Sequence, residues 1–244
     1  MILETLLALL TAHLIGDFVA QNDWMVENKK RFNVLLLHVF VLTALTALVM
    51  GTWSWPILAG TFGSHLAIDW IKSRAKDNLL TFTLDQAAHL MAALVIAIAF
   101  PIDFSNNVFL SQMPAAAQTY YFTVMIYAAG FIITVYVGAV VVGKTVGAYA
   151  QQITDEPVGL PGAGRMIGKL ERFLIFLLMI AGQASGIGFL VAAKSILRFG
   201  EITKADRKLS EYIIIGTFVS FAWAIACGYL TLQLLALWRA SADR

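Results

Sequence analysis

The residues best suited to chemistry lie in the first part of the chain, where histidines and aspartates recur at a fixed spacing. All four histidines of the sequence occur by residue 89. Three of them have an aspartate four residues away, which places a carboxylate beside an imidazole on one face of a helix. The pairs are His13 with Asp17, His65 with Asp69, and Asp85 with His89.

The order of histidine and aspartate is reversed in the third pair. The helix that carries this pair is expected to run opposite to the other two, so the reversal keeps the two residue types level. With a rise of about 1.5 Å per residue, the paired histidines lie roughly 10–12 Å inside the expected cytoplasmic helix ends. His38, on the second helix, lies about 8 Å inside, and the aspartates lie about 5–6 Å inside. We therefore expect one polar layer shared by four helices.

Ionisable side chains within membrane helices are costly, so this layer predicts a functional centre. Imidazole and carboxylate groups suit zinc, manganese or iron, and such a divalent transition metal would activate water for hydrolysis. Asp17, Asp69 and Asp85 are the candidate catalytic residues, and a carboxylate left unliganded would act as a general base. The same groups could instead relay protons or ions, or form a purely structural network. The expected metal ligands are His13, Asp17, His38, His65, Asp69, Asp85 and His89.

Other polar residues are candidates for binding an anionic substrate, such as a lipid-linked phosphate. Cationic side chains make strong hydrogen bonds to phosphate oxygens. Anchoring of the same cations at the membrane interface is the alternative interpretation. The candidate substrate-binding residues are Gln21, Lys29, Lys72, Arg74, Gln86, Arg165, Lys194 and Arg198.

Apolar helices must position these residues. Of the 244 residues, 59% are hydrophobic and 13% are charged, which is about half the charged fraction of a typical soluble domain. That composition excludes an ordinary cytosolic enzyme, and the net charge of +2 gives no indication of a nucleic-acid partner. The single cysteine, Cys227, excludes an internal disulfide. We expect an all-α, polytopic membrane protein whose partners include membrane lipids.

Stretches of roughly 20 apolar residues identify the candidate membrane segments. They cover residues 2–20, 33–51, 56–72, 82–101, 119–143, 170–196 and 209–238. The first is expected to be a permanent helix, because it lacks the basic start of a signal peptide. Lys and Arg follow the first and third segments and are absent from the loops after the second and fourth. Because basic residues accumulate in cytoplasmic loops, we expect the N-terminus outside.

Segment 170–196 has two interpretations, so the expected number of membrane segments is six to seven. The glycines at 182, 186 and 188 permit a re-entrant turn, which would keep the basic residues that follow inside. A plain crossing helix with Gly182 and Gly186 on a GxxxG packing face is the alternative. We expect a four-helix bundle carrying the His/Asp site over residues 1–101. An extracytoplasmic loop over 102–118 and a C-terminal helical membrane region over 119–244 should follow.

Several motifs carry a family resemblance. They are HLIGDFVAQ at 13–21, SHLAIDWIK at 64–72, DQAAH at 85–89, RMIGKLER at 165–172 and AAKSILRF at 192–199. Together they resemble a bacterial inner-membrane family, the domain of unknown function 3307 (DUF3307). The resemblance implies an inner-membrane location and marks these positions as the candidate site, but it implies no particular activity.

More distantly, the intramembrane His/Asp pattern is similar to that of membrane-bound, metal-dependent hydrolases that act on lipids. We therefore expect a metal-dependent membrane hydrolase whose centre lies near the cytoplasmic face. An ion, metal or proton-coupled transporter and a non-enzymatic structural protein are the alternatives.

Overall fold

The computed structural model describes residues 1–104, 111, 114–150, 160, 162–199 and 207–242. About 86% of the described residues are helical, and these residues contain no strand. Five helical segments among them are long and apolar enough to cross a membrane. They cover residues 2–20, 32–50, 79–99, 116–147 and 210–241. The expected all-α membrane fold class is confirmed.

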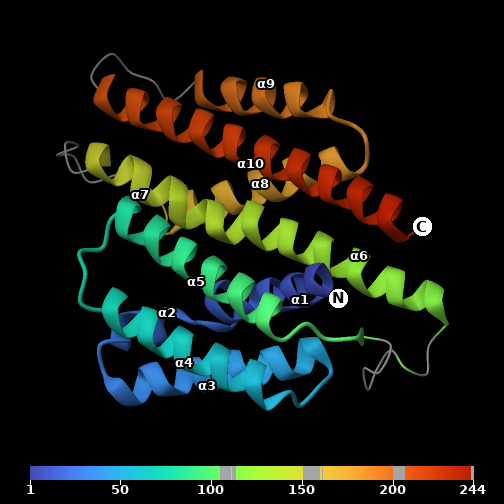
Figure 1. Ribbon diagram of the computed structural model, residues 1–244. Coiled ribbons are helices and arrows are strands. Elements are labelled where there is room, and N and C mark those ends of the chain that lie inside the picture. Colours follow the sequence, from blue (N-terminus) through green and yellow to red (C-terminus); the bar gives the residue numbers. More distant parts are fainter. Residues whose placement is uncertain (105–110, 112–113, 151–159, 161, 200–206, 243–244) are drawn as a thin grey trace. The chain divides into compact units, whose positions relative to one another are not determined.

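The chain divides into two compact units, and the first comprises residues 1–132 and 237–244. Its centre is a four-helix bundle in which each helix packs against two neighbours, and α6 packs on α1 (Figure 1). The bundle helices are α1 (Ile2–Ile15), α3 (Phe32–Met50), α4 (Trp55–Lys72) and α5 (Leu79–Ala99), and α6 covers Ala115–Ile132.

Local sequence signals set the limits of the bundle helices. α3 ends at Gly51, whose positive φ of 58° suits a residue without a side chain. Pro56 lies in the first turn of α4, where its missing N–H costs no hydrogen bond. Asn78 and Thr81 form a reciprocal capping box at the start of α5. α4 has 18 residues but is not among the five most apolar segments, because it contains polar and charged site residues.

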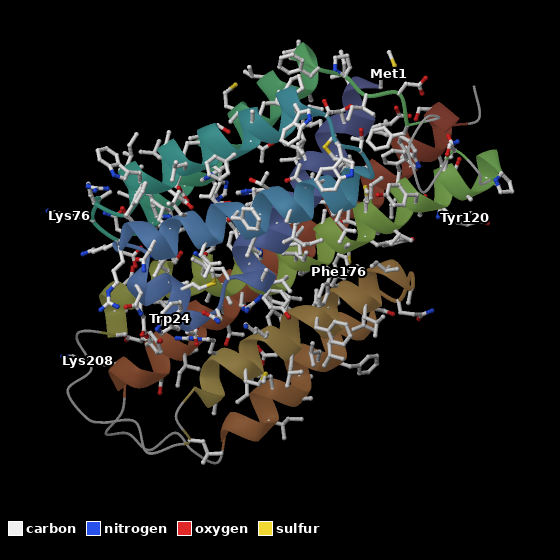
Figure 2. The ribbon with its side chains drawn as sticks, turned by 90° about the horizontal axis from the view of Figure 1, so that it is seen from below. Met1, Trp24, Lys76, Tyr120, Phe176 and Lys208 are labelled. Atoms are coloured by element: carbon white, nitrogen blue, oxygen red, sulfur yellow. The ribbon has the colours of Figure 1, made fainter. Side chains whose placement is uncertain are left out.

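The first helix does not stop at Ile15 but continues as a π-helical turn, η1 (Gly16–Ala20). The chain then turns at Gln21 and enters a short helix, α2 (Asp23–Asn28). Asn22 caps α2 by accepting a hydrogen bond from the Met25 N–H at 2.9 Å. Figure 2 shows Lys76, in the α4–α5 connection, at the end of this unit opposite Met1 and Tyr120.

The second unit covers residues 133–236 and is also helical. It contains η3 (Ile133–Val137), α7 (Gly138–Ala150), α8 (Ala163–Ile180), α9 (Gly186–Phe199) and most of α10 (Arg207–Ala242). Helices α8, α9 and α10 share a core of buried apolar side chains. The core residues are Ile175, Ile187, Phe221 and Ala224.

The segment expected at 170–196 is a helical hairpin and not one continuous crossing helix. α8 ends at Ile180, and Gly182 has a φ of 70°, which favours glycine. Gly186 begins α9 so close to α8 that a Cβ there would lie 2.9 Å from a Leu178 methyl. The two glycines therefore form a turn and a close approach, and the GxxxG interpretation of a plain crossing helix is wrong.

Some boundaries of the helices also differ from those expected from the sequence. α6, η3 and α7 form one helical run over 115–150, longer than the expected 119–143, and it shortens the expected 102–118 loop. Residues 105–110, 112 and 113 of that loop lie outside the described part of the chain.

Candidate metal centre

The predicted polar layer is assembled in the first unit, where all four bundle helices contribute to it. Helix α1 and η1 supply His13 and Asp17, α3 supplies His38, α4 supplies His65 and Asp69, and α5 supplies Asp85 and His89. The imidazole rings are adjacent, with centroids 4.3 Å apart for His65 and His89 and 5.2 Å apart for His38 and His65. His38, His65 and Asp69 are each no more than 2% exposed.

Four ligand-type atoms converge at the centre of the layer. They are His38 Nε2, His65 Nε2, Asp17 Oδ1 and Asp69 Oδ2. Five distances among these atoms lie between 3.1 and 3.4 Å. A tetrahedral zinc ion with bonds of about 2.0–2.1 Å separates its ligand atoms by about 3.3 Å. These five separations, four between an imidazole nitrogen and a carboxylate oxygen and one between the two imidazole nitrogens, are close to that ligand spacing.

Hydrogen bonding alone does not account for this convergence. A neutral imidazole Nε2 carries at most one proton, so two neutral rings can satisfy at most two of the five contacts. The 3.1 Å separation of His38 Nε2 from His65 Nε2 also brings two potential N–H groups face to face when both donate to carboxylates. A bound cation would satisfy all four atoms together.

His89 and Asp85 offer further unused ligand atoms beside this group. The Nδ1–H of His89 donates to the Asp85 backbone carbonyl at 2.9 Å, which directs Nε2 away from its own helix. Within the described residues, buried His89 Nε2 and Asp85 Oδ1 have no hydrogen-bond partner. Ligand atoms of His13, Asp17, His65 and His89 lie within 4.8 Å of one another, so these residues form a second group of possible ligands that shares Asp17 and His65 with the first.

A small cavity adjoins the histidines on the side away from the aspartates. It has a volume of about 30 Å³ and is lined by His13, His65, His89, Thr61, Ser64 and apolar side chains. That volume accommodates about one water molecule. Thr61 Oγ1 is buried there without a hydrogen-bond partner in the described structure, so a water molecule in the cavity would have polar neighbours.

Two lysines balance part of the buried negative charge. Lys29 Nζ lies 2.8 Å from Asp69 Oδ2, and Lys72 Nζ lies 2.8 Å from Asp85 Oδ2. With neutral imidazoles, three carboxylates and two ammonium groups leave a net charge of −1. Asp17 has no lysine partner among the described residues and contacts only imidazoles through its carboxylate.

The π-helical turn explains how Asp17 reaches the centre. Such turns insert an extra residue into a helix and recur at functional sites. Gly16 allows η1 to approach α3, since a Cβ at this position would lie 2.8 Å from Leu42 Cδ1. The turn at Gln21 and the short helix α2 then return the chain so that Lys29 reaches Asp69.

Of the remaining candidate substrate-binding residues of the first unit, two glutamines lie at the site and one arginine does not. Gln86 Oε1 accepts a hydrogen bond from His13 Nε2 at 3.3 Å, and its amide nitrogen donates to Asp85 Oδ2 at 3.0 Å. Gln21, with its amide oriented to satisfy both neighbours, donates to the Asp17 carbonyl and accepts from Lys29. Arg74 is not brought to the site, because its guanidinium stacks 3.8 Å from the exposed Trp70 ring and donates to the Trp70 carbonyl.

The other expected substrate-binding residues belong to the second unit. Arg165 is exposed on α8, and Lys194 of α9 pairs with Glu171 at 2.7 Å. Arg198 lies in α9, and its side chain is outside the described part of the structure. Sequence reasoning gave no role to Arg172, which is 2% exposed. Its spacing of three from the buried Ile175 on α8 could have indicated this burial.

The fold and the site define an all-α membrane protein with a buried His/Asp centre. Residues 5–119 match the family described as Protein of unknown function (DUF3307). All seven expected metal ligands lie within it, whereas the two later motifs lie beyond its end. No curated protein and no solved structure matches the chain.

Proposed function

We propose that the first unit binds a divalent transition metal in a His₂Asp₂ centre and that the protein is a metal-dependent membrane hydrolase. The observation that carries the proposal is the convergence of His38 Nε2, His65 Nε2, Asp17 Oδ1 and Asp69 Oδ2, with five separations of 3.1–3.4 Å among them. Nitrogen and oxygen ligands at this spacing favour zinc, with manganese and iron as alternatives. A bound ion would act as a Lewis acid and lower the pKa of a coordinated water molecule.

The residues around the proposed ligands suit proton transfer. Asp85 Oδ1 and His89 Nε2 are buried and unpartnered in the described structure, and His89 lines the water-sized cavity. Either could accept a proton from water, while Lys72 holds the other Asp85 oxygen in place. Lys29 and Lys72 also provide positive charge for an anionic substrate group that approaches from their side of the centre. We therefore propose Asp85 as the general base.

A transport function is less well supported than hydrolysis, because the part of the bundle beyond the histidines offers few free polar groups. A permeation path would need free polar groups there. The hydroxyl groups of Thr5, Thr11, Thr43 and Thr46 each donate to a carbonyl of their own helix four residues earlier. Apolar Leu9, Leu42 and Ile96 line the far side of the cavity. Thr61 Oγ1 is unpartnered in the described structure, but it lies in the cavity beside the histidines, and the groups beyond it support a one-sided polar centre.

We further propose that the protein lies in a bacterial inner membrane with its N-terminus outside. Basic residues cluster around the α4–α5 connection, at the end of the first unit opposite Met1 (Figure 2). By the positive-inside rule, this end faces the cytoplasm. The metal centre lies toward the same end, because Lys29 and Lys72 reach its aspartates.

Elemental analysis of the full chain, purified without chelator, tests the metal centre. We expect at least one zinc, manganese or iron ion per chain, and a sharp loss in the His65→Ala and Asp69→Ala variants. Lys194→Ala, in the second unit, is the matched control and should keep the wild-type stoichiometry. Equal metal content in all four proteins, or substoichiometric metal in the wild type, would contradict the proposal.

Hydrolysis is tested separately with bis(p-nitrophenyl) phosphate as the probe and protein in lipid nanodiscs. We expect chelator-sensitive turnover that falls about 10²–10⁴-fold in Asp85→Asn, the range for loss of a general base. The same variant should retain its metal, because Asp85 is not one of the four central ligands. A metal-loaded wild type that hydrolyses neither this probe nor lipid phosphates would reduce the centre to a structural one.

A further inference from the structure

The second unit contains a polar cavity that is separate from the metal centre. Its volume is about 300 Å³, at the lower end of the range for ligand-binding pockets. The wall combines glycines and valines of α7, α8 and α10 with a group of charged and hydroxyl-bearing side chains. This group comprises Arg165, Glu171, Arg172 and Lys194, together with the hydroxyl groups of Tyr212, Thr217 and Ser220.

Arg172 is the most informative residue of this cavity, because it is a buried cation with uncharged partners. Its side chain is 2% exposed, and its guanidinium donates to the Val135 carbonyl and to Ser220 Oγ at 3.0–3.4 Å. Val135 lies in the π-helical turn η3. Among the described residues, no carboxylate oxygen lies within ion-pair distance of Arg172. The nearby carboxylate of Glu171 is engaged by Lys194, and a buried charge without a direct counter-ion is costly, which indicates that a negative group completes the site.

The charged side chains that line the cavity also carry a net positive charge. Three cationic side chains line the cavity, and Glu171 is the one carboxylate among its described lining residues. Lys194 Nζ already engages Glu171 at 2.7 Å, so this pair is close to neutral. Arg165 and Arg172 therefore leave a net charge of about +2 along the cavity. They are seven residues apart on α8, which corresponds to roughly 10 Å of depth.

The backbone around Arg172 is shaped to admit its side chain. A Cβ at Gly138 would lie 2.9 Å from Arg172 Cδ, and a Cβ at Gly168 would lie 3.3 Å from its Nη1. Both glycines thus keep space for the guanidinium group. We propose that this cavity binds the phosphate group of an anionic amphiphile, with Arg172 at its base and Arg165 at its opening. Guanidinium groups bind phosphate oxygens in a bidentate manner, and the apolar wall suits a lipid chain.

Native mass spectrometry of the full chain in detergent tests this site with defined probes. The probes are dioleoyl phosphatidic acid, dioleoyl phosphatidylcholine and inorganic phosphate. We expect one phosphatidic acid per chain, bound much more tightly than phosphatidylcholine. Arg172→Gln and Arg165→Gln should each weaken phosphatidic acid binding roughly tenfold or more, since each removes a charge-assisted contact.

Lys169→Gln is the matched control, because it removes the same charge from the same helix. Lys169 Nζ lies over the Tyr136 ring at 4.7 Å and does not line the cavity, so phosphatidic acid binding should stay within about twofold. Arg165→Gln keeps the test decisive if Arg172→Gln does not fold. Wild-type affinity in the Arg165 and Arg172 variants, or equal affinity for both lipids, would overturn the proposal.

The inorganic phosphate arm identifies the source of the phosphate group. Displacement of phosphatidic acid by inorganic phosphate of similar affinity would assign the site to free phosphate, and failure to displace it would assign the site to a lipid. No binding of either probe overturns the proposal. The site does not depend on the metal centre, so chelator treatment should leave phosphatidic acid binding unchanged.

Discussion

The substitution Gly16→Ala tests whether the π-helical turn positions Asp17 in the centre. Gly16 has φ −60° and ψ −49°, which alanine adopts without strain, so the only direct perturbation is the added methyl group. Its Cβ would lie 2.8 Å from Leu42 Cδ1, whereas carbon atoms pack at about 3.5–4.0 Å. Either η1 or Leu42 must therefore move by about 1 Å. A similar movement of Asp17 would lengthen its 3.1 Å contact with His38 beyond hydrogen-bond distance.

Overpacking of this kind costs about 1–3 kcal/mol. For a chain of this size, that cost lowers Tm by roughly 2–12 °C. We expect this decrease in a thermal unfolding assay, together with reduced zinc content. Gly63→Ala is the matched control, because a Cβ there meets nothing within 4 Å and its Tm should not fall. The reasoning is refuted if Gly16→Ala keeps the wild-type Tm and zinc content, or if Gly63→Ala is equally destabilised.

Two further predictions concern charged side chains, and a third concerns the membrane topology. Lys29→Met leaves Asp69 buried without its ammonium partner, so metal-free protein should lose about 3–5 kcal/mol of stability. Zinc-loaded Lys29→Met should lose less, and equal losses in thermal unfolding with and without zinc would contradict a metal at Asp69. Arg74→Ala should change stability by less than about 0.5 kcal/mol and leave zinc content unchanged, because its side chain is exposed and remote from the ligands. In a Cys227→Ser background, single cysteines at Asn78 and Lys208 should react with a membrane-impermeant maleimide only after the cytoplasmic side is opened. Thr52→Cys should react from outside, and external labelling of Lys208→Cys would refute a hairpin that returns to the cytoplasmic side.

The bundle and the composition of its polar layer could be predicted from the sequence. The length of the apolar stretches identifies the membrane helices. Because Asp85 and His89 occur in reversed order on a helix of opposite direction, side chains of the same type are placed at the same depth. His38 has no acidic partner on its own helix, yet its depth placed it in the layer. Its partners, Asp17 and Asp69, come from neighbouring helices.

Other features depend on tertiary geometry that a hydropathy pattern does not carry. The π-helical turn at Gly16 arises from close packing against Leu42. The Lys29–Asp69 pair depends on the turn at Gln21 and on a six-residue helix too short for a clear apolar period. Arg74 lies near a helix end, where its long side chain could extend either toward the metal centre or over the exposed Trp70 ring. Packing favours Trp70.

X-ray absorption at the zinc K-edge of the zinc-loaded protein tests the central claim most directly. A His₂Asp₂ centre predicts four nitrogen or oxygen ligands at about 2.0–2.1 Å, with outer-shell scattering from two imidazole rings. His38→Ala and His65→Ala should each remove one imidazole contribution or abolish zinc binding. A zinc–sulfur distance of about 2.3 Å, six oxygen ligands, or the absence of zinc after dialysis would contradict the proposed centre.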